Sequence, residues 1–221
     1  MENLITTVQK HEREYPAPVF LGFLLKERWS LLDGKHEAWH NSNHERLAEI
    51  CSTGDCNLKR PDGWIQRWDF NRASCWNTIA GAEACAPEGE RHRYVLYAYR
   101  AVPIVFDNEG DPCEISPDEL FDIGLPPLPP EPDMPEFVSL GFDVVEYCGF
   151  LNYGCSPLSC NGMHNDYPVN QFCLLPDMNS AYTAAKAFGI EEPEPGPYII
   201  IEVLRHLDYK TSLSDSSMEL K

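Results

Sequence analysis

Four cysteines and one histidine gather between residues 148 and 173, in the pattern Cys148-x6-Cys155-x4-Cys160-x3-His164 followed by Cys173. Thiolates and imidazoles are ligands that zinc prefers, so one interpretation of this stretch is a metal site in a long loop. A second interpretation is a cysteine-dependent enzyme, in which His164 activates the thiolate of Cys155 or Cys160.

The spacing argues against both chemistries. The chain contains no Cys-x2-Cys turn to aim two sulfurs at one ion. Residues this close in sequence also rarely adopt the geometry of a catalytic triad. We therefore interpret the stretch as a structural loop with partly buried thiols and predict no metal there, with Cys155, Cys160 and His164 as the residues to test.

Three histidines at a spacing of four, His36, His40 and His44, would place neighbouring imidazoles on one helical face. The intervening Asn-Ser-Asn favours a helix start at Ser42 instead, and a start there would separate the three rings. The segment contains no cysteine, and its one carboxylate is Glu37. We expect no metal and no cofactor.

Cations and aromatic rings alternate between Lys59 and Arg72, and the segment includes Trp64, Arg67 and Trp68. Such a mixture is typical of a core helix, of a protein-binding hot spot or of a base-stacking surface. We favour the three interpretations in that order, because the formal net charge of −18 repels nucleic acid. If the segment is a contact surface, these three residues are the predicted binding residues.

The charge is unevenly distributed along the 221 residues. Residues 1–110 carry 13 basic and 16 acidic side chains, whereas residues 111–221 carry 4 and 19. This excess predicts an acidic face that attracts a basic protein partner and repels both nucleic acid and an anionic membrane. A helix that opens at Ser116 would present Asp118, Glu119 and Asp122 within about one turn, and we predict that these carboxylates take part in binding.

Several familiar chemistries lack their motifs. The sequence has no Gly-x-Gly-x-x-Gly, no Walker loop and no Gly-x-Ser-x-Gly. The pattern His-Glu-x-x-His occurs once, at residues 36–40, in the histidine series described above. An enzyme is therefore the less favoured class. No run approaches the roughly 20 apolar residues of a membrane span, and residues 1–15 lack the apolar centre of a secretory signal. With an odd count of nine cysteines, we expect a cytoplasmic protein with reduced thiols.

The elements that must position these residues mix strands and helices. Strands are expected at 19–25, 94–106 with a bend at Pro103, 137–146 with a bulge at Gly141, 172–175 and 198–204. Helices are expected to start at Ser42 and Ser116, to cover 64–68 and 76–80, and to run from Asn179 or Ser180 to a stop at Gly189. The order predicts an α+β fold, with a mixed, mainly antiparallel sheet and several short helices in a single compact domain. No internal repeat is visible at any period.

The chain divides by composition into three parts. Residues 1–124 are aromatic and nearly neutral, residues 125–136 form a proline-rich connector, and residues 137–221 are acidic with a polar tail. The leading functional hypothesis is a cytosolic accessory protein, of the antitoxin, immunity or defence-accessory kind, that engages a basic protein partner. The alternative is a small metal-binding or cysteine-dependent enzyme centred on residues 148–173.

Overall fold

A computed structural model describes residues 13–27, 69–86, 89–90, 93–120, 126–147, 155–207 and 209. The histidine series at 36–44, the predicted helix start at Ser42 and the tryptophan-rich segment at 64–68 lie outside these residues. Cys148, Asp122 and Gly124 lie outside them as well.

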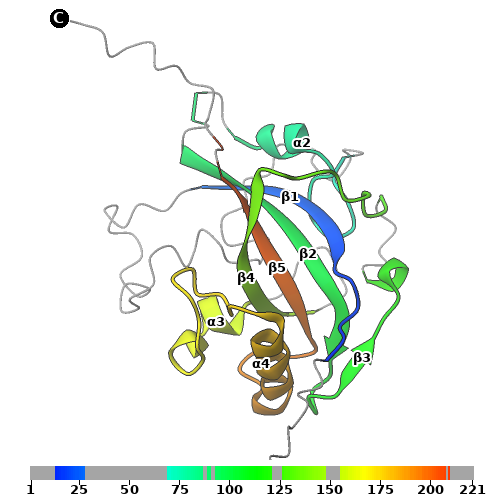
Figure 1. The fold of residues 1–221 in the computed structure, drawn as a ribbon, viewed down its shortest axis with the longest axis vertical. Coiled ribbons are helices and arrows are strands. Elements are labelled where there is room, and N and C mark those ends of the chain that lie inside the picture. Colours follow the sequence, from blue (N-terminus) through cyan, green and yellow to red (C-terminus); the bar gives the residue numbers. More distant parts are fainter. Residues whose placement is uncertain are drawn as a thin grey trace, which may run out of the picture.

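One antiparallel sheet of five strands organises the described chain (Figure 1). Its strand order is β1-β2-β5-β4, and the short β3 pairs with the far end of β2. The strands are β1 Val19–Glu27, β2 Tyr94–Phe106, β3 Pro112–Glu114, β4 Phe137–Glu146 and β5 Tyr198–His206. This arrangement confirms the predicted α+β class and the single compact domain.

Helices pack at both ends of the sheet (Figure 1). The longest is α4, whose small residues and Phe188 are buried against the sheet. The helical segments are α2 Ile79–Glu83, α3 Pro157–Cys160 and α4 Met178–Glu191, with 3-10 turns η5 at Pro117–Glu119 and η6 at Met163–Asn165. Tyrosines and aliphatic residues of β2 and β5 fill the core between the two ends.

The sheet has a pseudo-twofold axis between β2 and β5, where Tyr99 lies directly opposite Val203. On one side of this axis β1 pairs with β2, with a register shift at Gly22, which faces Tyr99. On the other side β4 pairs with β5, with the same shift at Gly141, which faces Val203. Both bulges occur in the tripeptide Leu-Gly-Phe, at 21–23 and 140–142.

An asparagine loop follows each bulged strand and repeats the same hydrogen bonds. Asn71 Oδ1 accepts from the backbone N–H groups of residues 73 and 75, while its Nδ2 donates to the Leu21 carbonyl at 2.7 Å. Asn170 Oδ1 accepts from residues 172 and 174, while its Nδ2 donates to the Leu140 carbonyl at 2.6 Å. Three residues after each asparagine, Ser74 and Cys173 both adopt a left-handed φ of 60°.

The correspondence continues into the helices. Thr78 caps α2 and Asp177 caps α4, each by accepting from the N–H three residues ahead. The described structure thus contains two similar halves, which we call the N-terminal half (the described residues of 19–106) and the C-terminal half (the described residues of 137–206). The equivalent positions differ by 119 residues in the first strand, by 99 in the asparagine loop and by 104 in the second strand.

The expectation that the chain has no internal repeat is therefore wrong. The repeat escapes a search for a fixed period because insertions of different length separate its elements. Between Gly22 and Asn71 the N-terminal half is 20 residues longer than the C-terminal half between Gly141 and Asn170. Only the backbone geometry restores the alignment.

Three predicted element boundaries need correction. Trp76 is not helical but bridges Phe23 and Phe70 in extended pairing, so the helix begins at Ile79. Of the expected strand at 172–175, only Leu175 pairs, with Phe142. The strand pairing changes register between Val102 and Val105, beside Pro103, and at Gly141, so the pairing is interrupted at both of the predicted places.

Helix α4 starts after Asp177 and continues through Gly189, which was predicted to end it. Gly189 has a packing role instead. A Cβ at this position would lie closer than 3 Å to the Asp107 carbonyl oxygen and to the backbone of Gly110. The turn after β2 thus rests directly on the helix backbone, and only glycine allows this approach.

We predict that Asn71→Ala lowers the free energy of unfolding by about 3 kcal/mol, because two backbone N–H groups and the Leu21 carbonyl lose their partner in a buried site. Asn170→Ala should cost less, since Asn170 is only partly buried. Urea unfolding measures both. Asn161→Ala, which removes a bond on the exposed surface, is the control. A loss for Asn71→Ala no larger than for this control would contradict the role of the loop.

We predict that Gly189→Ala destabilises the protein, although alanine is intrinsically about 1 kcal/mol better than glycine within a helix. Overpacking typically costs about 1–3 kcal/mol, and the new Cβ would meet backbone atoms that cannot rotate away. Urea unfolding should show a net loss of about 1–2 kcal/mol. The exposed Lys186→Ala on the same helix should change stability by less than about 0.5 kcal/mol. A stabilised Gly189→Ala variant would disprove the close contact.

Candidate functional site

Six exposed carboxylates follow β2 and form what we call the acidic strip. Its members are Asp107, Glu109 and Asp111 in the turn after β2, Glu114 on β3, and Asp118 and Glu119 on η5. The sequence contains no lysine or arginine between Arg100 and Lys186, and these 85 residues hold 14 acidic ones. The strip therefore carries a local negative charge that no basic residue from this part of the chain offsets.

Local hydrogen bonds fix the backbone of the strip. Asp107 Oδ1 accepts from the N–H groups of Glu109 and Asp111, at 3.0 and 2.8 Å, and so closes the turn. Ser116 and Glu119 form a capping box, and the helix predicted to open at Ser116 is a single 3-10 turn. Glu109, Glu114 and Asp118 project from this fixed backbone.

A second acidic segment meets the strip at the end of α4. Gly189 packs against Asp107, and a Cβ on Gly196 would overlap the side chain of Asn108, so residues 190–195 begin and end beside the same turn. This segment contributes Glu191, Glu192 and Glu194. Next to it, burial raises the pKa of Tyr198, and the charge of Glu194 raises this pKa further. The fold thus joins two acidic stretches that lie about eighty residues apart.

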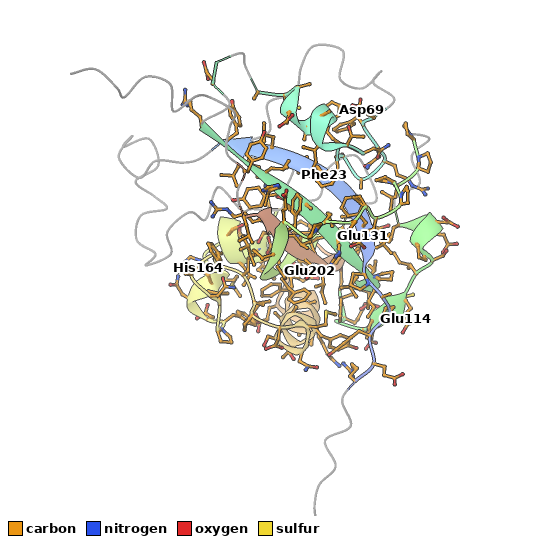
Figure 2. All side chains as sticks on the ribbon, turned by 45° about the horizontal axis from the view of Figure 1, so that its top comes forward. Phe23, Asp69, Glu114, Glu131, His164 and Glu202 are labelled. Carbon is orange, nitrogen blue, oxygen red and sulfur yellow. The ribbon has the colours of Figure 1, made fainter. Side chains whose placement is uncertain are left out.

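Arg100 on β2 lies between two carboxylates, Glu202 on β5 at 3.1 Å and Glu131 in the proline-rich segment. Both glutamates are labelled in Figure 2. Burial alone would lower the pKa of Arg100, but the hydrogen bonds and charges of the two glutamates raise it. This ion-pair bridge fastens the segment to the sheet, and Leu128 and Met134 add apolar contacts with the core. The segment therefore crosses the sheet as a bound strap.

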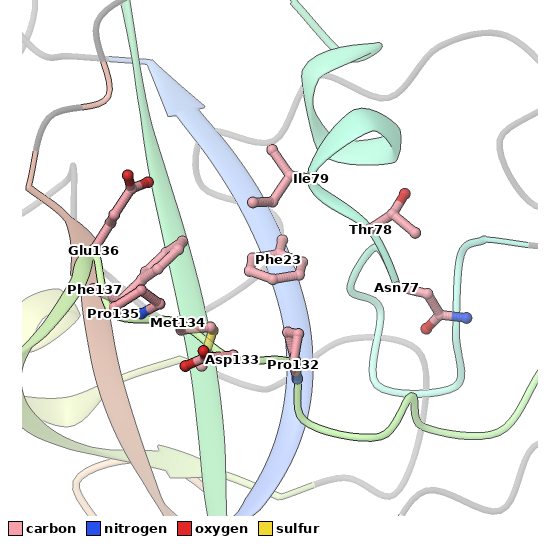
Figure 3. Close-up of a pocket in the computed structure, with 10 residues that line it drawn as sticks. All are labelled: Phe23, Asn77, Thr78, Ile79, Pro132, Asp133, Met134, Pro135, Glu136 and Phe137. Atoms are coloured by element: carbon pink, nitrogen blue, oxygen red, sulfur yellow. The ribbon is translucent and has the colours of Figure 1, made fainter.

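Beside this strap lies an apolar pocket of about 330 Å³ (Figure 3). Figure 3 shows Phe23 of β1 between Met134 and Phe137 on one side and Thr78 and Asn77 on the other. Ile79 at the start of α2 completes the apolar wall, while Asp133 and Glu136 add carboxylates to the lining. Glu136 also contacts His206 Nε2 at 2.8 Å.

The cysteine-rich loop is packed around one backbone carbonyl. His164 is buried and its Nδ1 donates to the Leu158 oxygen at 2.9 Å, while Cys173 Sγ lies 3.6 Å from the same oxygen. Cys155 comes two residues before α3 and is exposed. The side chain of Cys160 is outside the described structure. In the described part of the chain, no three histidine, cysteine or acidic side chains gather as metal ligands would.

The predicted binding residues fall into two groups. Asp118 and Glu119 are exposed on η5, within the acidic strip. Trp64, Arg67, Trp68 and Asp122 lie outside the described residues. Sequence reasoning missed the pocket and the asparagine loops. The repeated Leu-Gly-Phe tripeptide was the available signal for the second of these.

Comparisons with protein-family models, with curated proteins and with solved structures found no match for this chain. Among the described segments, no helix combines the length and the apolar character that crossing a membrane requires.

We predict that the protein binds no stoichiometric zinc through residues 148–173, because the ligand spacing offers no chelating turn and His164 is hydrogen-bonded to the backbone. Elemental analysis of protein purified without chelator tests this. One zinc per chain that disappears in Cys155→Ser or His164→Ala would contradict the prediction and support the alternative of a metal-binding domain.

Proposed function

We propose that the protein is an acidic binding module that engages a basic surface on a protein partner, in the manner of an antitoxin, immunity or accessory protein. The observation that carries this proposal is the acidic strip, which stands on a hydrogen-bonded turn, an edge strand and a capped 3-10 turn. Because the fold already fixes the backbone that carries these carboxylates, little further conformational entropy is lost when a complementary surface binds to them.

Electrostatic attraction of this kind acts mainly on the rate of association. Complementary charges steer two proteins into contact, and screening by salt removes the effect beyond about 10 Å at 0.1 M ionic strength. Each exposed carboxylate contributes little by itself. The proposal therefore needs several members of the strip to act together.

The net negative charge also bears on the kind of partner and on the compartment that we propose. Nucleic acid and anionic membrane surfaces are polyanions and would be repelled by a chain of net charge −18. We place the protein in the cytoplasm, with a basic protein as its partner. The alternative of a small cysteine-dependent enzyme has less support, because Nδ1 of His164, the residue that would activate Cys155 or Cys160, is hydrogen-bonded to the backbone carbonyl of Leu158.

We predict that the double variant Glu109→Lys and Glu114→Lys associates with the partner several-fold more slowly than the unmodified protein. Its stability should change little. Both carboxylates are exposed and belong to the strip. Affinity capture from the source cells at low and high salt, followed by kinetics with the purified partner, measures the effect. Adding Asp118→Lys should slow association further.

The matched control is the double variant Glu90→Lys and Asp166→Lys, which changes the net charge by the same amount outside the strip. It should bind nearly as fast as the unmodified protein. If both double variants behave alike, net charge alone is responsible and the strip is not a site. If no basic protein depends on the strip, or if binding is indifferent to salt, the proposed function is wrong.

A further inference from the structure

The pseudo-twofold axis gives the apolar pocket a counterpart in the other half of the molecule. The strap residues 132–137 lead into β4, and residues 13–18 lead into β1 at equivalent positions. The two segments read Met-Pro-Glu-Phe-Val at 134–138 and Tyr-Pro-Ala-Pro-Val at 15–19. Phe23, Thr78 and Ile79 in the pocket correspond to Phe142, Asp177 and Met178 in the C-terminal half.

Beside the C-terminal half a tyrosine from the segment before β1 occupies this position. Tyr15 corresponds to Met134, and it packs against the buried cluster that contains Phe106 and Phe188. Its ring centroid lies 5.7 Å from that of Tyr182, and its hydroxyl donates to Asn179 Oδ1 at 2.6 Å. The guanidinium of Arg13, two residues earlier, lies 4.0 Å from the Tyr182 ring. An aromatic residue with a neighbouring cation therefore occupies the counterpart site.

Beside the N-terminal half the narrower Met134, from the segment before β4, takes the place of the tyrosine, and the pocket remains beside it. Its volume of about 330 Å³ is at the lower end of the range for ligand sites, which is room for one ring rather than for a large cofactor. Phe23 and Phe137, whose ring centroids are 5.7 Å apart, offer the tilted aromatic surface against which another ring packs well.

The negative charge around the pocket favours a ligand that carries a positive charge beside its ring. Asp133 and Glu136 are exposed residues that line it, and no lysine or arginine is among the lining residues. In the counterpart segment, the residue equivalent to Glu136 is Ala17 and the residue equivalent to Pro132 is Arg13. The strap thus presents two carboxylates at the mouth of the pocket, where a cation-bearing segment would approach.

We propose that this pocket receives an aromatic side chain from a basic segment of the partner. The inference rests on the proposed function, since it names the anchor for the partner that the acidic strip attracts. The strip would speed the encounter, whereas the buried ring would slow dissociation, because a desolvated aromatic anchor acts mostly on the lifetime of a complex.

The peptide acetyl-Arg-Lys-Tyr-Pro-amide tests the pocket without the partner. Titrated into full-length protein labelled at its methionine methyl groups, it should shift the Met134 resonance saturably upfield, because the incoming ring stacks beside that methyl. The control peptide acetyl-Arg-Lys-Ala-Pro-amide should bind at least tenfold more weakly. No saturable shift up to about 10 mM, or equal shifts with both peptides, would overturn the proposal.

The variant Met134→Tyr should place in the N-terminal half the ring that Tyr15 supplies in the C-terminal half, and so close the pocket. We expect at least a fivefold loss of affinity for the tyrosine peptide, with the stability of the fold retained. Gln171→Tyr adds the same ring at an exposed position outside the pocket and should bind as the unmodified protein does. Unchanged peptide affinity in Met134→Tyr would place the peptide elsewhere and refute the inference.

The proposed function and the role of the pocket can be contradicted independently of each other. Partner binding that depends on Glu109 and Glu114 but not on Met134→Tyr would leave the proposed function standing and remove the pocket from it. Peptide binding at Met134 without any partner that depends on the strip would support an aromatic site and contradict the acidic binding module.

Discussion

The architecture depends on the contact between each asparagine loop and the bulge of the strand beside it. At a bulge the backbone leaves the regular ladder, so a carbonyl such as that of Leu21 needs another partner. Asn71 supplies it, and the loop then pairs Trp76 with Phe23 through two backbone hydrogen bonds of 2.8 and 3.0 Å. Gly22 allows this approach, because a Cβ there would lie 2.6 Å from the Trp76 carbonyl oxygen.

The contacts of the two asparagine loops also position the pocket and the acidic strip. The loop at Asn71 leads to Thr78, which caps α2 and forms one side of the pocket. The loop at Asn170 leads to Asp177, which caps α4. Near the other end of α4, Gly189 packs against the acidic turn. The strap between the halves is then held by Arg100, whose two glutamate partners come from the strap and from β5. The pocket, the acidic strip and the strap are thus each held by hydrogen bonds, ion pairs or close backbone contacts from a loop or strand of the sheet.

The sequence predicts the strands well because their signals are local. Aromatic and β-branched residues mark β2 and β5, and Gly141 marks a bulge within β4. The errors occur where a distant segment decides the outcome. Gly189 looks like a helix stop until Gly110 is placed against it, and Trp76 looks helical until Phe23 pairs with it. The acidic strip is visible in the composition, but its meeting with residues 191–194 and the pocket beside Met134 require the folded chain.

The pseudo-twofold axis has a consequence for how such a molecule can diversify. Two identical subunits joined along β2 and β5 would carry two identical sites, and any substitution would alter both at once. When both halves belong to one polypeptide, each can change independently. The crevice beside the C-terminal half is filled by Tyr15, whereas the equivalent crevice beside the N-terminal half has Met134 and open space. Covalent linkage thereby allows the two crevices to differ, so that one is packed with a side chain of the chain itself while the other stays open.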